Sequence, residues 1–228
     1  MNLKVIAFDA DDTLFVNEPY FQEVEQKFCG LMSDYLSHQG LSLELFKTEI
    51  GNLDLYGYGI KGYILSMIEA AMKISNNTIS IEIIAKIIEH GKELLQKPIE
   101  LLDGVEETLA RLHGNYKLIV ATKGDLKDQQ SKLHRSGLGN YFHHIEVMAD
   151  KQEINYHKLL TRLEIKPEEF FMIGNSLKSD VLPVLAIGGY AVHIPFHTTW
   201  EHEKISHNVE HPNFKTLEKI SDVLQILL

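Results

Sequence analysis

The chain has 228 residues, of which 44% are hydrophobic and 24% are charged, and its formal net charge at pH 7 is −10. The composition is that of a globular protein, and the acidic balance argues against nucleic acid and against an anionic membrane surface as partners. A single cysteine, Cys29, excludes an internal disulfide, and the absence of a transmembrane-length apolar run or a signal-peptide pattern favours a cytoplasmic location.

The first predicted element is a strand at residues 3–8, whose sequence LKVIAF is short and mostly apolar. Asp9, Asp11 and Asp12 follow it directly, in the sequence FDADDTLF. Three carboxylates close together at the end of a buried strand are unfavourable, because like charges repel and each group loses water. We therefore expect either a bound cation or one acid that stays protonated.

Residues 17–97 carry apolar side chains at helical spacing, which predicts a helical block without strands. The segment 51–63, GNLDLYGYGIKGY, interrupts this block with four glycines and three tyrosines. It is either an irregular turn between helices or a loop that reaches over a functional site. In the second case Tyr56, Tyr58 and Lys61 are the candidates for substrate selection.

From residue 98 onward the pattern alternates between helix and strand, which predicts an α/β protein with a doubly wound, Rossmann-like parallel sheet. This core would comprise residues 1–16 and 98–228, and the helical block 17–97 would be inserted into it. The expected strands are 118–122, 144–149, 170–174 and 190–194, and the expected helices are 103–114, 125–136, 153–163, 175–187 and 216–228.

Polar residues stand at the carboxyl ends of the predicted strands, where parallel sheets of this class place their sites. Carboxylates and carbonyl oxygens suit a hard cation, while tight-turn N–H groups, a hydroxyl and an ammonium suit phosphate oxygens. The pattern therefore predicts a magnesium and phosphate site. Its members are Asp9 and Asp11 after the first strand, Thr122, Lys123 and Gly124 at the second, Asp150 and Lys151 after the third, and Gly174, Asn175, Ser176 and Asp180 after the fourth.

Four motifs in this order resemble the haloacid dehalogenase (HAD) superfamily of phosphohydrolases. They are DADDT at 9–13, a strand that ends in Thr122, Lys151 before a helix, and GNSLKSD at 174–180. The resemblance covers the core and implies that residues 17–97 are a helical cap. It also implies a magnesium-dependent hydrolase of a small phosphorylated metabolite.

The resemblance assigns roles to the matching residues. Asp9 would attack phosphorus and form an aspartyl-phosphate, and Asp11 would protonate the leaving oxygen and then deprotonate the attacking water. An acid at position 11 favours phosphoester hydrolysis, because a halide leaves without a proton. Asp12 has no assigned chemistry, and we expect it to be solvated or to cap a turn.

The remaining matches would hold the metal and the phosphoryl group. Mg²⁺ would be held by Asp9, Asp11 (through its backbone carbonyl), Asn175 and Asp180. The phosphoryl oxygens would be bound by Thr122, Lys123 and Lys151.

Two positions depart from the family pattern. Asn175 stands where the family usually has an acid, which removes one negative charge from the metal site and predicts weaker magnesium binding. Gln152 rather than proline follows Lys151, so Lys158 on the next helix is a rival phosphate ligand. We favour Lys151, because it follows a strand end directly.

Three other functions stay open on the sequence alone: an inactive or weak phosphate-binding protein, a phosphomutase, and a phospho-receiver domain. Multiple turnover with water as acceptor would separate hydrolysis from all three. Five histidines near Trp200 lack metal-ligand spacing and are interpreted as a polar loop, although His197 could border the substrate site. They are His193, His197, His202, His207 and His211. The oligomeric state cannot be read from the sequence.

Overall fold

The computed structural model describes residues 2–228. By its internal contacts the chain divides into two compact units. The core unit comprises Met1–Glu18 and Ile99–Leu228, and the helical unit comprises Pro19–Pro98. Within the described range no helix is both long and apolar enough to cross a membrane.

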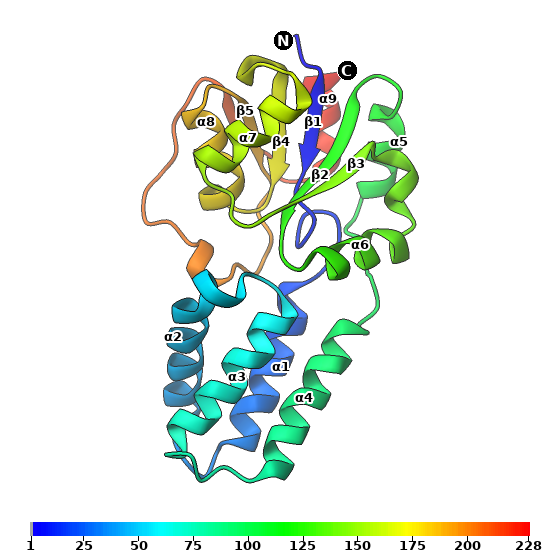
Figure 1. Ribbon diagram of the computed structural model, residues 1–228. Coiled ribbons are helices and arrows are strands. Elements are labelled where there is room, and N and C mark those ends of the chain that lie inside the picture. The colour runs from blue at the N-terminus through cyan, green and yellow to red at the C-terminus, as the bar shows by residue number, and fades with distance from the viewer. Residues whose placement is uncertain (1) are drawn as a thin grey trace. The chain divides into compact units, whose positions relative to one another are not determined.

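The core unit is built on one sheet of six parallel strands in the order β3-β2-β1-β4-β5-β6 (Figure 1). This strand order confirms the predicted doubly wound α/β fold. The strands are β1 (Val5–Phe8), β2 (Lys117–Lys123), β3 (His144–Met148), β4 (Phe170–Gly174), β5 (Tyr190–His193) and β6 (Phe214–Thr216).

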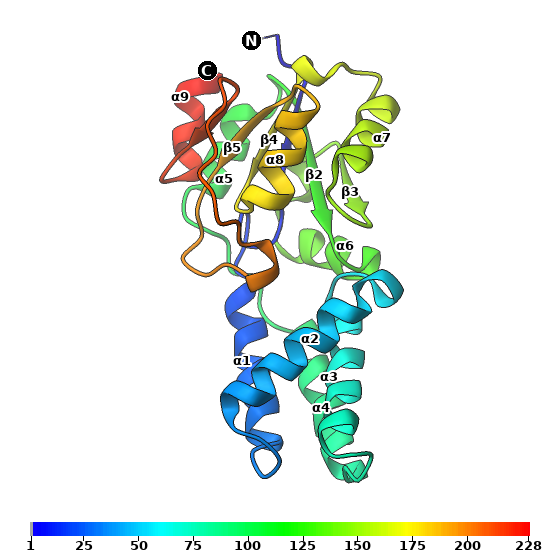
Figure 2. The same ribbon diagram turned by 90° about the vertical axis from the view of Figure 1, so that its left-hand side faces the viewer.

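Helices cover both faces of this sheet, and every residue of β1 is therefore buried. On one face α5 (Val105–Leu112) and α9 (Leu224–Leu227) pack against alternate strand residues such as Ile6 and Phe8. On the other face α7 (Glu153–Leu163) and α8 (Leu182–Ala186) pack against Val5 and Ala7 (Figure 2). The helix α6 (Leu126–Arg135) follows β2 and contributes Leu133 to the first of these clusters.

The register of the strands brings the predicted site positions to one edge of the sheet. Phe8 of β1 pairs with Val120 of β2 on one side and with Ile173 of β4 on the other. The residues that follow these three therefore emerge side by side. β1 lies where the strand order changes direction, which is the usual place for a ligand site in such sheets.

The helical unit contains four helices around an apolar cluster that includes Phe28, Met32, Met67 and Ile87. Ser37 caps the second helix by accepting a hydrogen bond from Gly40 N, and Ser80 caps the fourth by accepting one from Ile83 N. The helices are α1 (Glu18–Leu31), α2 (His38–Tyr56), α3 (Ile60–Ile74) and α4 (Ile81–Leu95).

The break predicted at residues 51–63 is shorter in the structure. Helix α2 continues through Gly51 to Tyr56, and the connection to α3 takes only residues 57–59. Gly57 and Gly59 have φ angles of +70° and +107°, so they supply the turn. A helical glycine costs about 1 kcal/mol relative to alanine, and α2 nevertheless continues through Gly51.

The predicted helix at 216–228 is wrong over its first half. Thr216 instead ends the edge strand β6, in which Phe214 pairs with Ala191 of β5, and residues 217–219 belong to no helix. A 3₁₀ turn at Ile220–Val223 then leads into the short helix α9. The apolar residues that predicted one long helix therefore lie in two short elements, and the sixth strand precedes them.

Candidate active site

A buried ammonium group joins two of the predicted acids. Lys151 Nζ lies 2.5 Å from Asp9 Oδ1 and 2.6 Å from Asp180 Oδ1. All three residues are buried, and Lys151 is 3% exposed. Asp9 is fixed at the end of β1 by its backbone N–H, which donates to Ile173 O of β4. The structure thus brings together the ends of β1, β3 and β4.

Burial and charge act in opposite directions on this cluster. Burial raises the pKa of Asp9 above its ordinary value. The Lys151 ammonium acts in the opposite direction, because it favours the charged carboxylate. Burial alone would lower the pKa of Lys151, but the Asp180 and Asp9 carboxylates raise it. The lysine therefore stays charged, and Asp9 depends on a neighbouring cation to keep its carboxylate form.

Asn175 lies on the other side of Asp9. The Thr13 hydroxyl is 3.3 Å from both Asp9 Oδ2 and Asn175 Oδ1, so its one hydrogen can be donated to either. The backbone carbonyl of Asn175 accepts a hydrogen bond of 3.0 Å from His193 Nε2. Burial lowers the pKa of His193, which therefore favours a neutral ring at neutral pH.

Asp180 is placed by an unusual turn after β4. Residues Leu177–Val181 form a π-helical turn, a rare geometry that often occurs at functional sites. Asp180 Oδ2 accepts a hydrogen bond of 3.0 Å from Ser176 N. A Cβ atom at Gly174 would lie 2.1 Å from the same oxygen, so only glycine allows the carboxylate to approach the strand end this closely.

The donor set of this cluster fits a hard cation. It offers carboxylate oxygens from Asp9 and Asp180 and an amide oxygen from Asn175, which are ligand types that Mg²⁺ accepts. The described residues contain no group of three or more acidic, histidine or cysteine side chains that could hold a metal, and at this cluster Asn175 contributes a neutral amide. With asparagine rather than an acid at position 175, the side chains that could bind the cation are two carboxylates and one amide.

The carboxylate of Asp11 points to α6. Its Oδ1 accepts a hydrogen bond of 2.9 Å from Lys132 Nζ, and its Oδ2 accepts one of 2.8 Å from Gln129 Nε2. Sequence reasoning missed both partners. The only signal was that Asp125, the N-cap of α6, and positions 128, 129 and 132 of that helix are polar at the spacing of the face that normally packs on a sheet.

Asp12 caps the chain that follows the motif. It is buried, has a φ angle of +58°, and its carboxylate accepts hydrogen bonds from Asn17 N and Glu18 N. The capping interpretation is confirmed and the solvated one is wrong. Burial raises the pKa of Asp12 to about 7, although the Asn17 N–H opposes this shift.

Thr122 and Lys123 stand at the end of β2, as predicted, but their side chains have different surroundings. Thr122 is almost fully buried, and its hydroxyl donates to Lys123 O at 3.2 Å. Lys123 Nζ lies 2.5 Å from Glu203 Oε1 and 3.0 Å from Ser179 Oγ. That Lys123 binds phosphate stays a prediction, and the structure gives its ammonium a carboxylate partner.

Glu203 connects the loop between β5 and β6 to this edge of the sheet. Besides Lys123, its carboxylate accepts hydrogen bonds from the hydroxyls of Ser176 and Ser179. Burial on its own would raise the pKa of Glu203, but Lys123 and the two hydroxyls lower it to about 2. No sequence signal indicated this residue, because it lies in the loop interpreted as merely polar.

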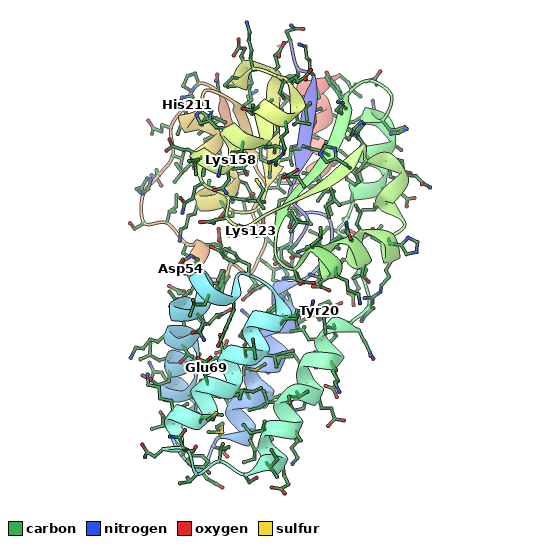
Figure 3. All side chains as sticks on the ribbon, in the orientation of Figure 1. Tyr20, Asp54, Glu69, Lys123, Lys158 and His211 are labelled. Carbon is green, nitrogen blue, oxygen red and sulfur yellow. The ribbon has the colours of Figure 1, made fainter. Side chains whose placement is uncertain are left out.

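The remaining sequence candidates are Lys158 of the core unit and three residues of the helical unit. Lys158, the rival of Lys151, is exposed on α7 (Figure 3). In the helical unit, Tyr56 ends α2 and hydrogen-bonds Glu69, Tyr58 lies in the turn, and Lys61 is exposed in the first turn of α3. Their part in substrate selection stays a prediction.

Comparison with known proteins places these residues in a family. The model of haloacid dehalogenase-like hydrolases matches residues 3–188. A glyceraldehyde 3-phosphate phosphatase from Pyrococcus furiosus is 28% identical over 200 residues, which are 82% of this chain and 78% of that protein.

Solved structures agree. A haloacid dehalogenase-like family hydrolase from Xanthomonas campestris has a TM-score of 0.89 and 36% identity, over 99% of this chain and 92% of that one. An L-2-haloacid dehalogenase from Xanthobacter autotrophicus shares the fold at a TM-score of 0.68 and 12% identity, over 98% of both chains. The family match over most of the chain confirms the predicted resemblance and the prediction of a hydrolase, and the chain belongs to the haloacid dehalogenase-like hydrolases.

Proposed function

We propose that the protein is a magnesium-dependent phosphatase that hydrolyses a small phosphorylated metabolite through an aspartyl-phosphate on Asp9. The observation that carries this proposal is the contact of Asp9 with Lys151, which in turn contacts Asp180. A buried carboxylate beside a fixed ammonium can attack phosphorus while the ammonium attracts the phosphoryl oxygens. The phosphatase relative from Pyrococcus furiosus supports the same reaction type.

In the proposed reaction an Asp9 carboxylate oxygen forms a bond to phosphorus as the bond to the leaving oxygen breaks. Asp11 gives its proton to that oxygen. Asp11 then takes a proton from water, the resulting hydroxyl attacks phosphorus, and the Asp9–phosphorus bond breaks. Thr122 and Lys151 would bind the phosphoryl oxygens during both steps.

We propose Asp9, Asp180, Asn175 and the Asp11 carbonyl as the ligands of Mg²⁺. The bound ion would supply positive charge to the phosphoryl oxygens. With a neutral amide at Asn175 the site holds one negative charge fewer than a third carboxylate would give. We therefore expect weaker Mg²⁺ binding than at an all-acid site.

The acid at position 11 favours a phosphoester over an alkyl halide, since only the former needs a proton on its leaving group. The substrate itself is left to experiment, and we propose that Tyr56, Tyr58 and Lys61 contribute to its selection. Glyceraldehyde 3-phosphate belongs in the first set of compounds, because the Pyrococcus furiosus relative bears that name.

The test is phosphate release from p-nitrophenyl phosphate and from a panel of sugar, triose, nucleotide and acid phosphates. Each would be measured with Mg²⁺, with EDTA, and with Asp9→Asn. We expect multiple turnovers that need Mg²⁺ and are lost in Asp9→Asn. Phosphate binding without turnover would overturn the proposal in favour of a phosphate-binding protein, and transfer to a second substrate hydroxyl instead of water would indicate a phosphomutase.

A further inference from the structure

The acid at position 11 is held by two side chains from one helix. Lys132 Nζ contacts one carboxylate oxygen at 2.9 Å and Gln129 Nε2 contacts the other at 2.8 Å. A carboxylate with a donor on each oxygen cannot rotate about its Cβ–Cγ bond without breaking both bonds. Each oxygen still keeps a second lone pair for a further partner.

Both donors are buried and are themselves fixed. The Gln129 side-chain amide also donates to Lys123 O at 2.9 Å, and Lys132 Nζ also contacts Asn17 Oδ1 at 2.8 Å. Gln129 is 2% exposed and Lys132 is 8% exposed. Burying an ammonium is costly unless it is paired and hydrogen-bonded, so Lys132 is tied to this position as long as Asp11 is there.

The contact between Lys132 and Asp11 bears on the proposed proton transfer from Asp11 to the leaving oxygen. When Asp11 gives its proton to the leaving oxygen, its O–H bond breaks and negative charge develops on the carboxylate. An ammonium 2.9 Å away stabilises that charge as it forms. The benefit grows with the basicity of the leaving oxygen, because a more basic oxygen needs the proton earlier.

We propose that Lys132 and Gln129 are positioning residues for Asp11, which orient its carboxyl group and support proton transfer to the leaving oxygen. The inference rests on the proposed phosphatase function and extends it to α6. The alternative is a purely structural role, in which Lys132 only fills the space between α6 and residues 9–13 and neutralises the charge of Asp11.

The experiment is kcat for a series of phosphate monoesters, from p-nitrophenyl phosphate, whose leaving group needs little protonation, to alkyl phosphates, whose leaving group needs it fully. For Lys132→Met we expect a few-fold loss with the nitrophenyl ester and about 10- to 100-fold with the alkyl esters, a part of the usual contribution of general acid catalysis. Gln129→Met should act in the same direction and more weakly. A loss that is equal for all leaving groups would overturn the proposal.

Two controls keep the outcome specific. Lys127→Met makes the same substitution on the exposed side of α6 and should leave all rates unchanged. In an Asp11→Asn background, Lys132→Met should cause no further leaving-group-dependent loss, and a persisting one would overturn the proposal. If Lys132→Met fails to fold, Gln129→Met tests the same point, because it removes one donor to Asp11 and leaves the ammonium in place, and an equal loss for all leaving groups would again overturn the proposal.

The failure of this inference is distinguishable from failure of the phosphatase proposal. If Asp9→Asn keeps full turnover, the proposed function is wrong. If Asp9→Asn is inactive while Lys132→Met reduces all substrates alike, only the role of α6 is wrong.

Discussion

The two units of the molecule differ in their ion pairs, because the core unit has buried pairs in addition to exposed ones such as Lys204–Glu201. In the core unit, Lys123, Lys132 and Lys151 have side chains at most 14% exposed, and each contacts a carboxylate. In the helical unit the ion pairs lie at the surface, as between Glu44 and Lys73 or between Lys27 and Glu93. Because buried charges add little net stability and are costly when unpaired, their concentration at one edge of the sheet indicates function. Surface pairs need no such explanation.

The largest effect should come from breaking the most deeply buried cluster. Lys151→Met removes the ammonium between Asp9 and Asp180, so turnover should fall by about 100- to 1,000-fold or more. Unfolding should become easier by about 3–5 kcal/mol in EDTA, since two buried carboxylates then face each other without a cation. Mg²⁺ should restore part of that stability.

Steady-state kinetics and denaturant unfolding, with and without Mg²⁺, measure both effects. The matched control is Lys158→Met, which changes an exposed lysine on α7 and should alter neither. A Lys158→Met enzyme as impaired as Lys151→Met would reverse our choice between the two lysines.

A pair of glycines compares the two units directly. A Cβ at Gly174 in the core unit would lie 2.1 Å from Asp180 Oδ2 and 2.6 Å from Asp180 Cβ, so Gly174→Ala must displace a proposed metal ligand. We expect a stability loss of about 1–3 kcal/mol and weaker Mg²⁺ binding. A Cβ at Gly91 in the helical unit would lie 2.0 Å from Ile64 Cδ1 and 2.2 Å from Ile64 Cγ1, so this side chain must also move, but it belongs to no proposed metal ligand.

For Gly91→Ala the displacement of Ile64 should cost about 1–3 kcal/mol of stability, which a gain in helix propensity of about 1 kcal/mol offsets in part, while Mg²⁺ binding should stay unchanged. Calorimetric titration with Mg²⁺ and urea unfolding of both variants test the contrast. Equal Mg²⁺ affinity in Gly174→Ala and Gly91→Ala would argue against Asp180 as a ligand.

An effect of similar size that depends on pH is expected at Glu203, whose side chain is 11% exposed and hydrogen-bonds Ser176 and Ser179, the chain neighbours of the proposed metal ligands Asn175 and Asp180. Its pKa is lowered from 4.5 to about 2, so the folded state favours the carboxylate by about 3 kcal/mol. This stability is fully present above pH 4.5 and is lost as the pH falls toward 2. Glu203→Gln should therefore be less stable than the wild type at pH 7, and the difference should shrink below pH 5.

Unfolding free energies of the two proteins between pH 7 and pH 3 measure this convergence. The control is Glu201→Gln, an exposed acid in the same short 3₁₀ helix. A difference between wild type and Glu203→Gln that stays constant with pH would contradict the role of the carboxylate charge.

The same contrast explains what the sequence could predict. The strands other than β6 and the residues at the strand ends were predictable, because alternation of strand and helix fixes where Asp9, Thr122, Lys151 and Asp180 emerge. The partners from α6 and from the β5–β6 loop were not, because a lysine or glutamate that becomes buried looks the same in sequence as an exposed one. Only the fold shows that Lys132 and Glu203 have lost their water.

The Asn175 substitution illustrates a different limit. The sequence revealed the missing charge, but the contact through Thr13 to Asp9 depends on the turn after β1. The predicted helix at 216–228 failed for a third reason. The short edge strand Phe214–Thr216 depends on pairing with β5, and pairing between distant segments leaves no local pattern.

The smallest effect is expected in the helical unit, at Glu44. Its carboxylate contacts Lys47 and Lys73 at 3.0 Å each, but both lysine side chains are more than half exposed. Water and salt screen such pairs, so Glu44→Gln should leave the thermal unfolding midpoint unchanged at physiological ionic strength and should shift it slightly at low salt. Thermal unfolding at both salt concentrations is the measurement, with Glu203→Gln as the buried counterpart. A salt-independent loss at Glu44 as large as that at Glu203 would show that the helical unit also depends on fixed charges, and the functional interpretation of the buried lysines would lose its contrast.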